Sequence, residues 1–99
     1  MYKLRYLPSA NLDMIEAESY LFEYSPPAAD KLSLAFEENT DALIGHPFMY
    51  PVYRGNPYFR FITLPYEYLC FYHVDEEAKI INVHRVLHGM RDIQSILSE

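Results

Sequence analysis

Apolar positions in the first half of this chain recur at the spacing of an α-helix. They do so along two stretches, residues 9–24 and 26–43, and the line of aligned positions in each stretch includes one polar residue. The aligned positions are Leu12, Ile15, Ser19 and Phe22 in the first stretch and Ala28, Leu32, Ala35, Phe36, Asn39 and Leu43 in the second. Ser9 and Ser25 stand where N-cap residues are expected, and Gly45 suits a left-handed helix end. We predict two helices that form an antiparallel hairpin.

The second half is patterned for β-strands. Runs rich in aromatic and β-branched residues cover residues 58–64, 68–74 and 79–87, and a further short run covers residues 2–7. The short links between the last three favour an antiparallel meander. Alternation in the last run gives one face with Ile80, Asn82, His84, Val86 and His88 and another with Ile81, Val83, Arg85 and Leu87. Both faces are largely apolar, so we expect the hairpin to cover one, and the tail at residues 90–97 or a partner chain to cover the other.

Together these patterns predict an α+β fold of order β-α-α-β-β-β. A helical hairpin packs on a small, mainly antiparallel sheet, and a short helix or tail ends the chain. Of the 99 residues, 51% are hydrophobic, so residues 1–99 are expected to form a single domain around one core. Residues 46–57 contain three prolines and one glycine and are predicted to be a loop.

The formal net charge is −6, and the acidic residues concentrate in the predicted helices. An acidic surface repels phosphate backbones, so direct binding to free DNA or RNA is not expected. No apolar run is long enough to cross a bilayer, and the first residues lack the apolar core of a secretory signal. These features predict a cytoplasmic protein without a membrane segment.

Residue types that bind metals or act as nucleophiles form no recognisable motif. Cys70, the single cysteine, lies in an apolar run and is expected to be buried and inert. His84 and His88 are separated by about 13 Å if they lie on one strand, which is too far to share a metal ion. The chain also has no glycine-rich phosphate loop. We therefore expect neither a metal nor a cofactor.

Short motifs spread over the whole chain carry a resemblance to a known family. They are Tyr2-Lys3-Leu4, Ser9-Ala10, Leu12, Ile15, Ala29, Leu32, Leu43, Pro47, Arg60, Tyr68, Tyr72, Val74, Ile81, Val83, Arg85, Val86, His88, Gly89, Arg91 and Asp92. In these positions the chain resembles the RelE/ParE superfamily of toxins from bacterial type II toxin-antitoxin systems. The exit from the last strand is of the ParE-like type, which implies that Gly89 adopts a positive φ and that Arg91 pairs with Asp92 or a strand carbonyl.

The resemblance implies two alternative activities. A ParE-like toxin inhibits DNA gyrase by binding, and the residues expected to contact the target are Tyr50, Tyr53, Arg54, Tyr58 and Arg91. A RelE-like toxin cleaves messenger RNA on the ribosome, and its catalytic candidates here are Arg60, His84, Arg85, His88 and Arg91. We favour the ParE-like hypothesis, because Leu64-Pro65 and Leu69 replace arginines of the RelE pattern.

Either activity implies a cognate antitoxin, whose disordered segment folds across the toxin. Its apolar residues are expected to contact the hairpin at Leu12, Ile15, Phe22, Leu32 and Phe36. A third hypothesis is a degenerate relative that binds its antitoxin and poisons nothing. The leucine at position 69 keeps that hypothesis open.

Overall fold

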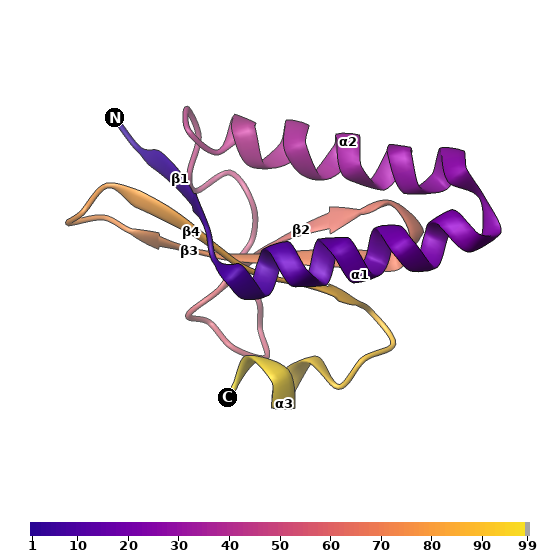
Figure 1. Ribbon diagram of the computed structural model, residues 1–99. Coiled ribbons are helices and arrows are strands. Elements are labelled where there is room, and N and C mark those ends of the chain that lie inside the picture. The colour runs from indigo at the N-terminus through magenta and orange to yellow at the C-terminus, as the bar shows by residue number, and fades with distance from the viewer. Residues whose placement is uncertain (99) are drawn as a thin grey trace.

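Two long helices cover one face of a four-stranded sheet, and a short third helix lies on the opposite side (Figure 1). The computed structural model describes residues 1–98. Its elements are β1 (Lys3–Tyr6), α1 (Pro8–Tyr24), α2 (Pro26–Ala42), β2 (Arg60–Leu64), the 3-10 turn η1 (Pro65–Glu67), β3 (Tyr68–Asp75), β4 (Ile80–His88) and α3 (Ile93–Leu97). The predicted α+β fold is confirmed. Residue 99, the end of the predicted domain, lies outside the described residues.

The strands are ordered β1-β4-β3-β2 across the sheet. β2, β3 and β4 form the antiparallel meander expected from their short links. β1 pairs in parallel with β4, from Lys3 opposite Ile80 to Tyr6 opposite Val83. β1 and β2 are therefore the two edge strands, and β4 and β3 are central.

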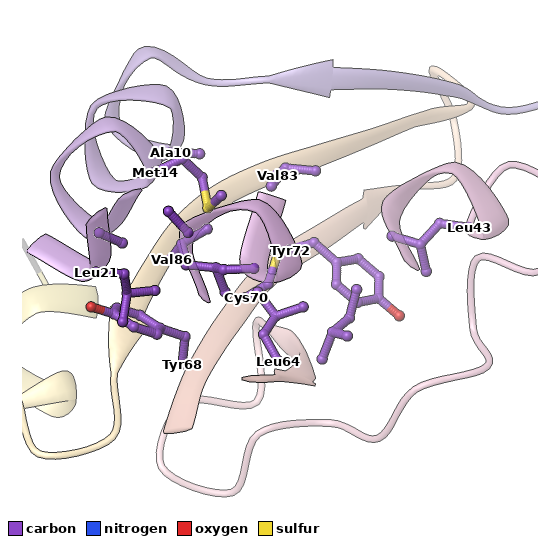
Figure 2. Close-up of a cluster of buried hydrophobic side chains, with 14 of the residues drawn as sticks. Ala10, Met14, Leu21, Leu43, Leu64, Tyr68, Cys70, Tyr72, Val83 and Val86 are labelled. Atoms are coloured by element: carbon purple, nitrogen blue, oxygen red, sulfur yellow. The ribbon is translucent and has the colours of Figure 1, made fainter. Parts of the chain in front are cut away.

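The larger core lies between the sheet and the two long helices (Figure 2). In it, Met14 and Leu21 of α1 pack with Cys70, Tyr72 and Val83 of the strands. Burial raises the pKa of the Cys70 thiol to about 12, so the thiol stays protonated. Cys70 is thus buried, as predicted, in a form that is a poor nucleophile.

A smaller core covers the second face of the sheet, and its buried members are Phe59, Phe71, Leu87, Ile93 and Leu97. The last two belong to α3, which confirms that the C-terminal segment covers this face. The carboxylate of Asp92 begins α3 by accepting hydrogen bonds from the backbone N–H and the hydroxyl of Ser95, at 3.4 and 2.8 Å. Asp92, one of the two partners predicted for Arg91, thus caps a helix instead.

The predicted apolar line of α1 faces solvent and not the core. Leu12, Ile15 and Phe22 are 65%, 60% and 61% exposed. The residues that α1 buries are Ala10, Met14, Ala17 and Leu21. Both lines have helical spacing, but the buried line includes two alanines, whose small side chains let the helix backbone approach the sheet closely.

A β-bulge in β4 shifts the alternation of its side chains. The register on its two sides is Phe71 opposite Arg85 and Tyr72 opposite Val83. His84 is therefore one extra residue on β4. Beyond the bulge, Val86 lies in the core beneath the helices with Val83, and Leu87 lies in the second-face core. The predicted division of β4 into two strictly alternating faces is wrong, because an inserted residue reverses the alternation after it.

α1 begins one residue before the predicted cap. Pro8 occupies the first turn, where its missing N–H costs no hydrogen bond. Ser9, predicted as the N-cap, instead donates a hydrogen bond from its hydroxyl to the carbonyl oxygen of His84 at 2.7 Å. Ser25 does stand at the N-cap of α2, although within the described chain its side chain makes no capping hydrogen bond.

Left-handed backbone conformations fall on residues other than glycine. Tyr66, Glu67 and Lys79 have φ angles of 62°, 63° and 59°, and no glycine among residues 1–98 has a positive φ. Gly45 and Gly89 therefore do not have the left-handed conformations predicted for them. Gly89 meets another need, because its N–H donates to the carbonyl oxygen of Glu67 at 2.8 Å and a Cβ there would lie 3.3 Å from that oxygen.

Replacing Glu67 with glycine is expected to stabilise the protein by about 1 kcal/mol, because glycine adopts this backbone conformation without the steric cost of a Cβ. Urea denaturation followed by circular dichroism measures the change. The control is Glu77→Gly, in the β3–β4 turn, where φ is not positive. That substitution is expected to leave stability unchanged or to lower it, and an equal gain at both positions would contradict strain at Glu67.

Candidate functional site

The first half of α1 closes the free edge of β4. β1 pairs with β4 only as far as Val83, and beyond that point α1 side chains bind the β4 backbone. The Asp13 carboxylate accepts a hydrogen bond from the Val86 N–H at 2.9 Å. It also pairs with Arg85 through contacts of 2.7 Å to Nε and 3.0 Å to Nη2. This bidentate pair holds the bulged part of β4 against α1.

A hollow of about 670 Å³ opens beside the bulge, and we call it the second-face hollow. Its lining residues are Ser9, Asn56, Tyr58, Phe59, His84, Arg85, Ile96, Leu97 and Ser98. The end of α3 forms one wall, and the segment that leads into β2 forms another. The bulge brings His84 and Arg85, although consecutive, to the same hollow.

Aromatic rings surround the His84 imidazole. The Phe59 and Tyr58 rings lie edge-on to it, with centroids at 5.0 and 6.2 Å. Tyr58 stacks in turn on His73, with centroids 3.8 Å apart and an interplanar angle of 9°. Tyr58 is 55% exposed. These residues present an aromatic surface with polar edges, which is typical of protein-binding sites.

Basic side chains of β1 lie on the same face of the sheet. Leu4 and Tyr6 pack against the core beneath the helices, so Lys3 and Arg5 point to the second face, where both are exposed. Asn82 lies opposite Arg5, and its side-chain oxygen is buried without a hydrogen-bond partner among the described residues. The second face therefore combines tyrosine, histidine and basic side chains.

Stability is expected to depend on the protonation of His84. Burial, and then the neighbouring His73, lower the pKa of His84 from its ordinary value of 6.5. The unfolded chain then binds more protons than the folded one, so this contribution to stability is fully present above pH 6.5 and is lost as the pH falls towards the folded-state pKa.

We expect the free energy of unfolding to fall between pH 7 and pH 5, and to fall less in His84→Gln. Urea denaturation at a series of pH values measures both slopes. The matched control is His46→Gln, because His46 is exposed in the loop after α2. A His84→Gln slope equal to that of the wild type would exclude His84 as the source.

Most of the predicted target-binding residues lie on the second face. Tyr58 lines the hollow, Tyr53 packs against the second-face core, and Arg54 is exposed in the turn between them. Tyr50 is turned the other way, because its hydroxyl donates to a side chain of α2 at 3.1 Å. Arg91 lies apart, in a hollow of about 340 Å³ between α1 and the end of β4.

The two histidines proposed for a ribonuclease do not meet. His84 lies on the second face, whereas His88 packs edge-on against Tyr68 at 5.2 Å, beneath the helices. The prediction that they share a face is wrong, because the bulge at His84 reverses the alternation between them. A general acid and a general base must reach one substrate position, and these two imidazoles flank different hollows.

The candidate catalytic arginines are also dispersed. Arg60 donates to the carbonyl oxygen of Tyr50 at 2.7 Å and lies 5.1 Å from the centre of the Phe48 ring, so it anchors the loop before β2. Arg85 is paired with Asp13, as described above, and Arg91 is exposed beyond β4. These guanidinium groups do not converge on one place where a phosphate could sit.

The outer side of the hairpin carries most of the residues predicted to contact an antitoxin. Leu12, Ile15 and Phe22 are exposed there. Phe36 is partly buried, and its ring lies 5.6 Å from that of a β1 tyrosine. The prediction that Leu32 contacts an antitoxin is wrong, because Leu32 is 0% exposed within the larger core. It therefore cannot touch another chain while the protein is folded.

Sequence reasoning missed several residues of these sites. Asp13 was missed, as was its pairing with Arg85, because the two residues are 72 positions apart and no local pattern connects them. His73 gave a weak signal as a polar residue within the apolar run of β3. Lys3 and Arg5 gave another, because they alternate with apolar residues in β1.

Among residues 1–98, no group of three or more His, Cys, Asp or Glu side chains is placed to hold a metal ion. Within the same residues, no helix is both long enough and apolar enough to span a bilayer.

The fold and these surfaces define a small α+β protein with two separate faces suited to binding, one aromatic and basic and one apolar and acidic. A protein-family model described as the ParE toxin of type II toxin-antitoxin system, parDE, matches residues 4–93. The chain therefore belongs to this toxin family. A solved structure described as the chromosomal ParDE TA system from P. aeruginosa shares the fold, with a TM-score of 0.71 and 20% identity over 89% of this chain and 96% of that chain. No curated protein sequence matches this chain.

Proposed function

We propose that this protein is a toxin that acts in the cytoplasm by binding DNA gyrase, without catalysing a reaction of its own. The observation that carries the proposal is the second face, where the exposed Tyr58 lines a hollow with His84 and Arg54 is exposed in the preceding turn. Tyrosine and arginine contribute most of the binding energy at many protein interfaces. Membership of the ParE toxin family supports the toxin role, and the dispersed histidines and arginines support binding over catalysis.

Inhibition of gyrase supercoiling by the purified protein tests this proposal. Tyr58→Ala and Arg54→Ala are each expected to raise the concentration for half-inhibition by at least about tenfold, because each removes an exposed anchor. The control is Tyr66→Ala, since Tyr66 is also exposed but lies in the β2–β3 turn. It is expected to leave inhibition within about twofold, as peripheral residues usually do.

Different results would favour the other hypotheses. If supercoiling is unaffected and primer extension in cells finds cuts at codons in the ribosomal A site, the protein is a ribonuclease. Loss of growth arrest in both His84→Ala and His88→Ala, with the fold retained, would point the same way. Normal growth on expression, with an intact antitoxin complex, would identify an inactive relative.

The antitoxin partner is proposed to bind the outer side of the hairpin. Leu12, Ile15 and Phe22 are large apolar side chains that face solvent along one helix, and Phe36 lies partly exposed on the neighbouring helix. Such a stripe is the usual footprint of an amphipathic segment that folds on binding. Leu32 is left out of this surface because it is completely buried.

A further inference from the structure

A groove with an apolar floor and acidic margins runs between α1 and α2. At one end it widens into a hollow of about 460 Å³, where Met14 and Phe36 form part of the floor. Glu18, Glu37 and Asp41 also line this hollow. The floor offers contact area to an apolar side chain, and the carboxylates remain at the margin where they keep water.

A second hollow, of about 400 Å³, continues the groove towards the link between the helices. Phe22 and Ala29 supply its apolar surface, and Asp30 lies at its margin. Glu18 lines both hollows. Its carboxylate accepts a hydrogen bond from the Ser33 hydroxyl, and this bond links α2 to α1. The two hollows therefore adjoin at Glu18, and we call them together the hairpin groove.

An exposed apolar side chain extends the groove along α1. Asn11, Glu18 and Phe22 line the two hollows. Ile15 falls on the same helical face, because it lies four residues after Asn11 and three before Glu18. Ile15 is 60% exposed. A groove between two antiparallel helices, with apolar residues at such intervals, matches the surface of a third amphipathic helix.

The charge of the hairpin selects the kind of helix that fits. Residues 8–42 hold eight Asp and Glu and a single Lys, whereas the rest of the chain has a net charge of +1. Within the described chain, no Lys or Arg lines either hollow of the groove. A helix with acidic margins would be repelled by these carboxylates, and one with basic margins would be attracted.

We propose that the hairpin groove receives an amphipathic helix whose apolar face is flanked by Lys and Arg, and that this helix is the toxin-binding segment of the antitoxin. The inference rests on the proposed antitoxin partnership and adds the chemistry of the partner. The apolar face of the helix fills the floor beside Phe22 and Phe36, and its basic side chains reach Glu18, Glu37 and Asp41. The antitoxin segment thus has a net positive charge.

The test uses the complex with the antitoxin encoded beside this gene, and measures its dissociation constant by titration calorimetry. The double variant Glu37→Lys/Asp41→Lys is expected to weaken binding by at least about tenfold, since like charges across an interface repel. The control, Glu76→Lys/Glu77→Lys, makes the same change of net charge in the exposed β3–β4 turn. It is expected to change binding by less than about threefold, because screening weakens distant charges.

A measurement on the unaltered complex makes the test independent of how the variants fold. Raising the salt concentration from about 0.05 to 0.5 M is expected to weaken binding at least tenfold, because it shortens the screening length. If binding ignores salt and the groove variants, while Phe22→Ala still weakens it, the inference is wrong and the antitoxin partnership stands. If both double variants weaken binding equally, the groove is not the charged contact. If the neighbouring gene product does not bind at all, both proposals fail.

Discussion

Replacing Leu32 with alanine is expected to lower the free energy of unfolding by about 3 kcal/mol, within the range for large-to-small changes in a close-packed core. Leu32 is 0% exposed and packs in the cluster beneath the two helices. The loss is a large part of the total of roughly 5–15 kcal/mol that holds a small domain together. Urea denaturation measures it directly, and the midpoint of thermal unfolding is expected to fall by roughly 15 °C.

Phe22→Ala is the matched control, because it removes a larger apolar side chain that is 61% exposed. Its effect on stability is expected to stay within about 0.5 kcal/mol, as for most surface positions. Its effect on the antitoxin complex is expected to be large instead. If Phe22→Ala destabilised the protein as much as Leu32→Ala, the assignment of the two helix faces would be wrong.

The second large effect is expected at Asp13. Replacing it with alanine removes the bidentate contact to Arg85 and the acceptor of the Val86 N–H, at a cost of about 3 kcal/mol. The pair is only partly buried, with side chains 25% and 13% exposed, so the cost lies towards the low end for buried pairs. Urea denaturation measures the free energy of unfolding of Asp13→Ala. The control is Glu23→Ala, which changes an exposed position on the same helix.

A double-mutant cycle separates the ion pair from the rest of this effect. Asp13→Ala with Arg85→Ala is expected to cost less than the sum of the two single changes, because each single change already removes the same Asp13–Arg85 contact. Additive costs would mean that the two side chains do not interact in solution. The Val86 N–H loses its acceptor in every variant that lacks Asp13, so the double variant is still less stable than the wild type.

Much of the candidate site could be proposed from the sequence only as single residues. Tyr58 and Arg54 were predicted as target contacts; Tyr58 lines the second-face hollow, and Arg54 is exposed in the segment that leads to it. His73, Lys3 and Arg5 were not predicted, although they share that face. Local patterns identify exposed aromatic and basic residues, but they do not show which strands bring them together.

By itself, the sequence determined the order of helices and strands, the helical hairpin and the antiparallel meander. Periodicity and short links decide these features, and both act over a few residues. The tertiary structure alone decided that α1 buries Met14 and Leu21 and exposes Phe22, because α1 has two apolar lines and only packing chooses between them. It also decided the bulge at His84. The ion pair between Asp13 and Arg85, which joins residues 72 positions apart, was likewise decided only by the tertiary structure. Such contacts depend on where the backbone brings distant strands and helices together, and no local pattern records that.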